Sequence, residues 1–300
     1  MNSVITQTLL PAALAVVMAG LGLSLTAADF RRVARHPKVV TVSLLLQLVL
    51  LPAVCFGITY ALGLSPVLAT GMMLLAASPG GTVANVFSHL FHGDVALNVT
   101  LTAINSVIAV VTVPAVVEFA LWHFQPDLGE DGMGLQFTKL IQVFAVVLIP
   151  VALGMLVRRS KPDFAERLDR PVRLVSTVVL ALVVLVAVFS ERVHLGGYFA
   201  SVGLAALVFC LVSLAVGFWV PRALGVRHRQ AVAAAFEIGA HNATLAMTLA
   251  MTTLGSVRLA IPAAVYAMIM IPVTAAFGWA LTCREDDLAT AAPSPAEGAN

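Results

Sequence analysis

Charged side chains are scarce in this 300-residue chain, where Asp, Glu, Lys and Arg together make up 11% of the residues. Soluble proteins average about a quarter. Hydrophobic residues instead make up 60%, and apolar stretches of about 20 residues recur, each long enough to cross a hydrocarbon core about 30 Å thick. The composition therefore excludes an ordinary soluble domain and indicates an all-α protein that crosses a membrane many times.

Cysteine and the motifs of enzymes are also scarce. The three cysteines, Cys55, Cys210 and Cys283, are far apart and form no CxxC, so neither a disulfide framework nor a metal site is indicated. No second acid, nucleophile–base pair, HExxH or nucleotide-binding motif occurs within the apolar stretches. An enzyme or sensor embedded in the membrane is thus the weakest functional interpretation, and we expect no enzymatic activity.

Hydropathy predicts nine membrane spans, at residues 5–27, 39–62, 66–91, 95–121, 135–157, 172–190, 198–220, 229–254 and 258–282. Most of the 17 Lys and Arg residues fall in the loops on one side of these spans. Cytoplasmic loops of membrane proteins carry the excess of positive charge. We therefore expect a multi-pass protein of the cell (inner) membrane, with its N-terminus outside and its C-terminus in the cytoplasm.

The chain divides into two halves at its longest outer connection, residues 122–134. The first half, 1–121, contains four predicted spans, and the second half, 135–282, contains five. Residues 283–300 are polar, small and Pro-containing, which predicts a disordered cytoplasmic tail.

The third and eighth spans, 66–91 and 229–254, contain residues that disfavour a helix. The third has Pro-Gly-Gly at 79–81, and the eighth has Gly239. Proline removes a backbone donor and clashes with the preceding turn, and glycine adds backbone freedom, so both helices should break there. Broken backbone at membrane depth is tolerated only where it faces protein or a wet cavity. For the third span taken alone, a kinked helix packed by its neighbours is an equal alternative.

The two interrupted spans occupy corresponding places in the two halves. The third runs from outside to inside and the eighth from inside to outside, and one long span follows each. This pattern predicts inverted repeats. In transporters it marks a binding site near the middle of the membrane.

Four segments resemble the bile acid:sodium symporter family. They are "GLGLSLTAADF…HPKVV", "SPGGTVANVF", "GDVALNVTLTAIN" and "FEIGAHNATLA", and the similarity covers most of residues 18–280. The chain is similar to the nine-helix form that lacks the first of ten helices. The resemblance implies a core domain of spans 2–4 and 7–9, in which the two broken helices cross, and a panel domain of spans 1, 5 and 6. It also implies sodium-coupled symport of an organic anion by alternating access.

A proton-coupled or uncoupled carrier of a related family, of the arsenite or auxin efflux type, is the alternative. The arsenite type relies on a reactive cysteine near its crossover, and neither broken segment of this chain contains one. The sequence does not name the substrate, because a small carboxylate and a bile-acid-like molecule fit equally well. Besides the lipid bilayer, we expect Na⁺ and this anion as partners, no nucleic acid, and a monomer as the working assembly.

Two sodium sites follow from the resemblance. The first maps to Asn85, Asn98, Thr102 and Glu237, with a backbone oxygen of residue 84. The second maps to Gln47, Glu237, His241 and the carbonyls of Ile238 and Ala240. Asn98 could instead mark only the start of a helix, and Gln47 could merely bond a neighbouring helix.

The chemistry of Glu237 agrees with a sodium site. An uncompensated charge at membrane depth costs several kcal/mol, and no Lys or Arg lies near the middle of any span to pair with it. Sodium is a hard cation that prefers oxygen ligands. A bound cation is therefore the natural partner, and a protonated, hydrogen-bonded Glu237 is the weaker alternative.

Substrate charge can be inferred from the two half-helices that begin after the breaks. Their free amides and helix dipoles present positive potential, which favours an anion. The expected substrate contacts are Thr82, Val83, Asn105 and Asn242, together with Asn85. Any of these could instead be a contact between helices, and for Asn105 that interpretation is at least as strong.

His241 makes the second site uncertain, because relatives usually have Gln there. Imidazole offers nitrogen, a poor match for an alkali cation, and it titrates near pH 6.5 when unperturbed. His241 could hold a proton beside Glu237 where the second sodium would otherwise bind. Equally, it could be a neutral side chain that hydrogen-bonds across the crossover while Na⁺ remains. We therefore expect the protein to bind one or two Na⁺ ions.

Overall fold

The computed structural model describes residues 36–127 and 195–291, with short pieces between 149 and 171 and the single residues 19 and 23. These two long stretches contain the six spans expected to form the core domain. The predicted spans at 5–27, 135–157 and 172–190 lie outside the described residues except for those pieces. The connecting residues 128–134 and the chain end at 292–300 also lie outside them.

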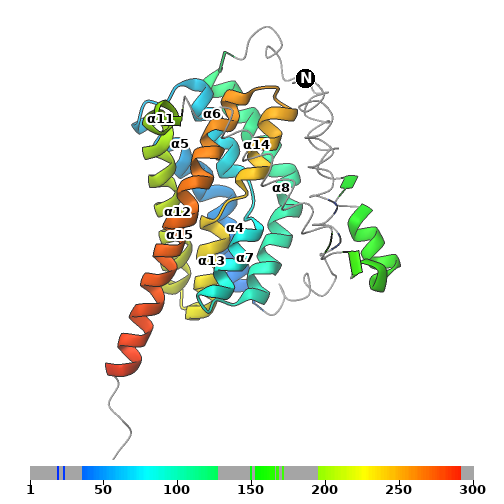
Figure 1. Cartoon of the computed structure of the whole chain (residues 1–300), viewed down its shortest axis with the longest axis vertical. Coiled ribbons are helices and arrows are strands. Elements are labelled where there is room, and N and C mark those ends of the chain that lie inside the picture. The colour runs from blue at the N-terminus through cyan, green and yellow to red at the C-terminus, as the bar shows by residue number, and fades with distance from the viewer. Residues whose placement is uncertain are drawn as a thin grey trace, which may run out of the picture.

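The described part of the chain is helical, without strands apart from one isolated bridge. Its elements are α4 (Pro37–Leu45), η2 (Leu46–Leu50), α5 (Leu51–Ala61), α6 (Pro66–Ala77), α7 (Thr82–Leu90), α8 (Val95–Phe124), α11 (Leu195–Tyr198), η3 (Phe199–Gly203), α12 (Leu204–Ala223), α13 (His228–Gly239), α14 (Ala243–Thr252) and α15 (Val257–Ala291). Figure 1 shows them packed side by side in one bundle.

Three described helices are long and apolar enough to cross a membrane, and a fourth is added if the two parts of α8 count as one span. The three are Pro37–Ala61, Gly196–Ala223 and Val257–Thr282. They coincide with predicted spans at 39–62, 198–220 and 258–282. These findings agree with a helical membrane protein.

Both predicted helix breaks are present. Helix α6 ends at Ala77 and α7 begins at Thr82, which leaves Ser78–Gly81 extended between them. Helix α13 ends at Gly239 and α14 begins at Ala243. Neither half of either pair is long enough to cross a membrane alone, since a crossing takes about 20 helical residues.

The two breaks lie against each other and hydrogen-bond through their backbones. The Gly81 N–H donates to the Ala240 carbonyl at 3.0 Å, and the Asn242 N–H donates to the Pro79 carbonyl at 2.8 Å. Helix α6 packs against α14 toward one end of the bundle, and α7 packs against α13 toward the other (Figure 1). Each break therefore satisfies backbone groups that the other exposes, as irregular backbone at membrane depth requires.

A wide helical turn, η2, interrupts the helix between α4 and α5 and was not predicted. Its Leu51 N–H donates to the Leu46 carbonyl five residues back. Pro52 follows at once and has no N–H to donate, so the regular bonding pattern cannot continue across it. The turn contains Gln47, which is 3% exposed.

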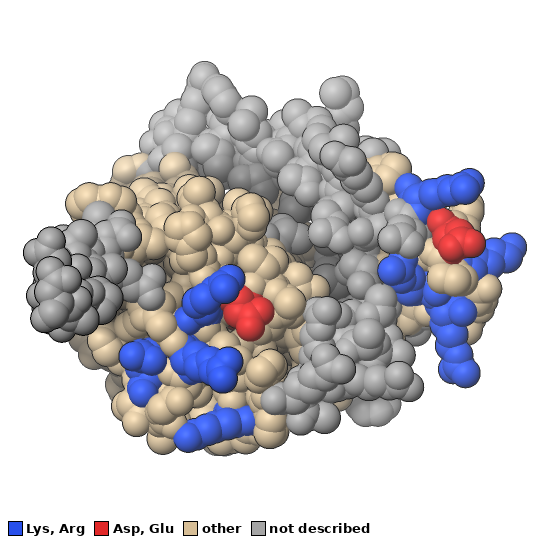
Figure 2. Space-filling model, turned by 90° about the horizontal axis from the view of Figure 1, so that it is seen from below, with Lys and Arg blue, Asp and Glu red and all other residues tan. Residues whose placement is uncertain are grey.

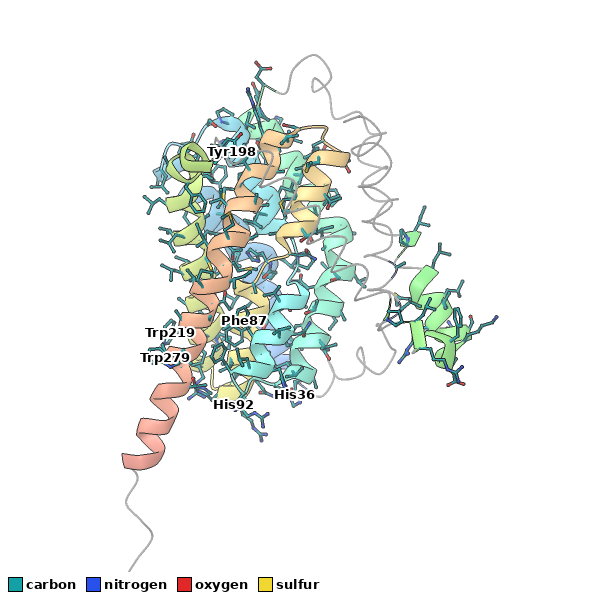
Figure 3. The ribbon with its side chains drawn as sticks, in the orientation of Figure 1. His36, Phe87, His92, Tyr198, Trp219 and Trp279 are labelled. Carbon is teal, nitrogen blue, oxygen red and sulfur yellow. The ribbon has the colours of Figure 1, made fainter. Side chains whose placement is uncertain are left out.

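Helix α15 continues to Ala291, beyond the predicted span end at 282 and into the tail expected to be disordered. Its last turns project from the bundle (Figure 1). Trp219 and Trp279 lie near one end of the bundle, which also carries His36 and His92, and Tyr198 lies at the other end (Figure 3). Both tryptophans are exposed, as interfacial anchors are.

Candidate functional site

The buried carboxylate of Glu237 occupies the place where the two breaks meet. Glu237 stands in the last turn of α13 and is 1% exposed. Its carboxylate lies directly over Gly80 of the first break, where an added Cβ would overlap it. Only a glycine leaves room at this position for the carboxylate group.

One oxygen of this carboxylate is bonded and the other is not. The Thr102 hydroxyl of α8 donates to Oε2 at 2.5 Å. The Asn105 side chain and the Gly80 N–H are the other donors nearby, yet Oε1 has no hydrogen-bond partner of ordinary geometry within the described residues. No Lys or Arg is among the described neighbours of the carboxylate. The charge is therefore left without a protein counter-ion there.

Three buried amide oxygens on the helices that pack against α13 share this lack of a partner. The Asn98 amide nitrogen donates to the Ala233 carbonyl of α13 at 2.7 Å, which leaves Asn98 Oδ1 unbonded among the described residues. Asn105 Oδ1 on α8 and Asn85 Oδ1 on α7 are likewise buried without a partner there. Helices α7 and α8 both pack against α13. The residues expected at the first sodium site thus come from three neighbouring helices.

The start of α8 separates two interpretations of Asn98. Asp94 is the N-cap residue, and its side chain accepts from the Leu97 N–H at 3.0 Å. Asn98 lies one turn further into the helix, and Thr102 one turn beyond it, so the two share a face. Asn98 therefore has no capping role, and its buried amide oxygen still lacks a function within the helix. The Ala84 side chain, beside the expected backbone ligand, is buried.

Buried oxygen atoms without partners are costly, because each has lost its water without gaining a hydrogen bond. A group of such oxygens with one carboxylate is what a hard monovalent cation requires, since Na⁺ binds carboxylate, amide and hydroxyl oxygens. Glu237, Asn85, Asn98, Thr102 and Asn105 could supply this set. Chemically, the arrangement can bind a cation, and it offers no nucleophile.

Gln47 of η2 and His241 of the second break are neighbours. The Gln47 amide nitrogen donates to the Ser78 carbonyl at 3.0 Å and lies 3.5 Å from His241 Nδ1. Gln47 Oε1 and His241 Nε2 have no partner in the described part of the chain. Of the carbonyls expected at the second site, that of Ala240 already accepts from Gly81. Ile238, whose carbonyl was also expected there, lies in the last turn of α13.

Tyr266 is a site residue that the sequence analysis missed. Its hydroxyl donates to the carbonyl of Gly239, the last residue of α13, at 2.6 Å. Its ring stacks on His241, with centroids 5.6 Å apart and planes 19° apart. The available signal was a tyrosine inside the apolar stretch "YAMIMIPV", because a buried tyrosine hydroxyl needs a partner.

The residues expected to bind substrate lie at the two half-helix starts and on α8. Thr82 and Val83 open α7, whose N-cap Gly81 provides no side-chain cap. Asn242 is the N-cap of α14, and its side-chain oxygen accepts from the Leu245 N–H at 3.0 Å. The Asn242 oxygen is thus engaged with its own helix, while Asn105 is 2% exposed beside Glu237.

The comparison with protein families now adds to this geometry. Residues 11–197 match the model of the Sodium Bile acid symporter family, which is more than half of the chain. The chain belongs to this family. Membership places the chain in a family of membrane transporters rather than in an enzyme family.

Relatives along most of the chain are named as sodium-dependent carriers. A probable chloroplastic sodium/metabolite cotransporter of Oryza sativa subsp. japonica is 28% identical over 86% of this chain and 60% of its own length. An uncharacterized sodium-dependent transporter of Bacillus subtilis (strain 168) is 29% identical over 85% of this chain and 77% of its own length. The ileal sodium/bile acid cotransporter of Homo sapiens is 24% identical over 82% of this chain and 70% of its own length. This chain thus spans about 60% of the length of the rice relative.

Proposed function

We propose that this protein is a secondary transporter that couples the entry of Na⁺ to the uptake of an organic anion by alternating access. The observation that supports it most is Glu237, buried at 1% exposure where two helix breaks meet. A buried charge is retained where it has a partner. The unbonded amide oxygens around it are ligands that Na⁺ prefers, so a sodium ion bound by Asn85, Asn98, Thr102 and Glu237 supplies that partner.

The anionic charge of the substrate is inferred from the positive ends of the half-helices that begin at the two breaks. Helix α7 begins at Thr82 without a side-chain cap, and although the Ala84 N–H donates to the Gly81 carbonyl, the amides of Thr82 and Val83 remain available to a ligand. The positive end of its dipole points the same way. A carboxylate bound by Thr82, Val83, Asn105 and the Asn242 amide would balance the sodium charge. The substrate class we propose is a small carboxylate or a bile-acid-like molecule.

The arrangement of the halves supports alternating access. We propose that residues 1–121 and 135–282 are inverted repeats, because each contributes one broken helix to the same contact. In this fold, two groups of helices move against each other around a fixed site at the breaks. The described core would carry the site, and the spans at 5–27, 135–157 and 172–190 would form the panel against which it moves.

The orientation is proposed from the distribution of positive charge. The Arg229 side chain donates to the His92 carbonyl at 3.0 Å, and Gln230 lies 3.2 Å from His36, so residues 36, 92 and 229–230 share one end of the bundle. Exposed cationic residues at this end are Lys38, Arg222, Arg227 and Arg229. Figure 2 shows Lys and Arg gathered on the face seen from this end. By the positive-inside rule, this end of the bundle is the cytoplasmic one. The N-terminus would then lie outside the cell and the C-terminus in the cytoplasm.

A thermal-shift screen of the purified protein against organic anions, each in sodium chloride and in choline chloride, tests this function. A ligand that binds only the folded protein raises its melting temperature by mass action. We expect small carboxylates or bile acids to raise it in sodium and much less in choline. Stabilisation by cations or neutral molecules, equal in both salts, would contradict the proposal and favour an uncoupled carrier.

A further inference from the structure

We infer that this chain binds a single sodium ion, because the second predicted ion position has an imidazole N–H and one free amide oxygen, of Gln47, in place of a set of oxygen ligands. The inference deepens the proposed function and rests on it. In this interpretation His241 is not a sodium ligand. It instead limits the number of sodium ions that the protein binds.

The orientation of the Gln47 amide follows from its partner. The Ser78 carbonyl can only accept a hydrogen bond, and the Gln47 amide group facing it stands 3.0 Å away. That group must therefore be the NH₂ and not the oxygen. The NH₂ of Gln47 is thereby directed at the first break, and its oxygen Oε1 is buried without a partner among the described residues.

The same amide group fixes the protonation pattern of His241. Nδ1 of the imidazole lies 3.5 Å from the Gln47 nitrogen, at the long limit of a hydrogen bond. An NH₂ group has hydrogens to donate and no lone pair to accept, so Nδ1 can only be the acceptor of this pair. The neutral ring then carries its hydrogen on Nε2. Neither nitrogen is left with a lone pair for a cation.

Packing holds the imidazole in this position. The ring is 1% exposed, and it lies between Phe209 of α12, at a centroid distance of 5.0 Å, and Tyr266 of α15, at 5.6 Å. Tyr266 is itself anchored by its hydrogen bond to Gly239. Turning the ring away from Gln47 would require the surrounding aromatic contacts to be broken, so the arrangement is not a chance rotamer.

The two predicted ion positions therefore differ in the oxygen atoms that they offer. On α7, α8 and α13, the buried atoms without a partner among the described residues include four oxygens, those of Glu237, Asn85, Asn98 and Asn105. At Gln47 and His241 they are one amide oxygen, Gln47 Oε1, and the imidazole Nε2, which carries a hydrogen. Among the described residues, Glu237 supplies the charge at the paired breaks, and one carboxylate balances one Na⁺. A second cation would find one free amide oxygen and an N–H where it needs several oxygen lone pairs.

The test is a count of bound sodium. Radioactive sodium chloride is titrated onto the purified full-length protein in nanodiscs, with choline chloride holding the ionic strength constant, and the bound ions per protein are read at saturation. We expect one ion per protein and a Hill coefficient near one. Two ions per wild-type protein would overturn the inference and leave the proposed function standing. The absence of saturable sodium binding would overturn the proposed function itself.

Two variants sharpen this count. His241→Gln places an amide oxygen where the imidazole N–H was and releases Gln47 from its partner, so we expect two ions per protein and a Hill coefficient that rises toward two. Adding Gln47→Leu to His241→Gln should return the count to one, because the gained ion then lacks its second oxygen ligand. A single ion in folded His241→Gln protein, with circular dichroism and the melting temperature showing an intact fold, would contradict the assigned role of His241.

Discussion

The two helix breaks are paired in space but are built in different ways. The first, Ser78–Gly81, is formed by residues that cannot continue a helix, and it carries no side-chain cap. The second, Ala240–Asn242, is fixed by side chains: Asn242 caps α14, and Tyr266 bonds the last carbonyl of α13. The first break therefore follows from residues that disfavour a helix, whereas the second also has a side-chain cap and a tertiary contact with α15.

The two breaks therefore contribute differently to the site. The first break provides space and backbone, because Gly80 has no side chain where the carboxylate lies. The second provides charge and position, since Glu237 stands in the last turn of a helix whose end is anchored by Tyr266. A carboxylate can thus be held at depth by a regular helix while the neighbouring break makes room for it and for an ion.

The largest expected effect comes from filling the space at the first break. Gly80→Ala places a methyl group on the Glu237 carboxylate, and we expect sodium affinity to fall roughly a hundredfold, about 3 kcal/mol, at the upper end of the cost of overpacking. Gly81→Ala is the matched control, because its Cβ would lie 3.6 Å from the nearest atom, in ordinary contact. Sodium titrations of both variants check this. Equal affinities in the two would show that Gly80 is not needed for space.

A smaller effect is expected from loosening the anchor of the second break. Tyr266→Phe removes the hydroxyl that bonds the Gly239 carbonyl and leaves that buried group without its donor. We expect a loss of about 2 kcal/mol in unfolding free energy, measured as a lower melting temperature. Tyr60→Phe, at an exposed position on α5, is the control and should change little. A Tyr266→Phe protein as stable as the wild type would show that the anchor is unimportant.

The smallest effect is expected at the cap of the second break. Asn242→Ala removes the side-chain oxygen that accepts from Leu245, and losing an N-cap costs about 1 kcal/mol. Asn242→Ser retains an oxygen at the cap and should recover most of the melting temperature. If the two variants melt together, the cap contributes no stability. Anion affinity measured on the same two proteins also tests whether the Asn242 amide contacts substrate.

The parts of the site that could be predicted from sequence are those with a local cause. Both breaks were predicted because Pro79, Gly80 and Gly239 act locally, through missing donors and backbone freedom. Glu237 stood out because a carboxylate in an apolar stretch needs a partner. These signals require no knowledge of which helices are neighbours.

The parts that could not be predicted depend on contacts between distant segments. The orientation of the Gln47 amide is set by the Ser78 carbonyl 31 residues away, to which its NH₂ donates. The wide turn that carries Gln47 reflects Pro52 and the packing around it, and the hydropathy of the span gave no sign of it. Tyr266 meets Gly239 only because α15 packs against α13. The sodium ligands themselves remain a proposal.

Sodium-dependent stabilisation of Glu237→Gln compared with the wild type tests the central claim most directly. The substitution keeps the size of the side chain and removes its charge, and Glu118→Gln, at an exposed position of α8, is the matched control. Melting temperatures are measured in rising sodium chloride against choline chloride. The account predicts that the wild type and Glu118→Gln gain about 2.7 kcal/mol at a hundred times the dissociation constant, and that Glu237→Gln folds but gains nothing. A Glu237→Gln protein with the sodium dependence of the wild type would contradict the account, because the ion would then bind without the carboxylate at the paired breaks.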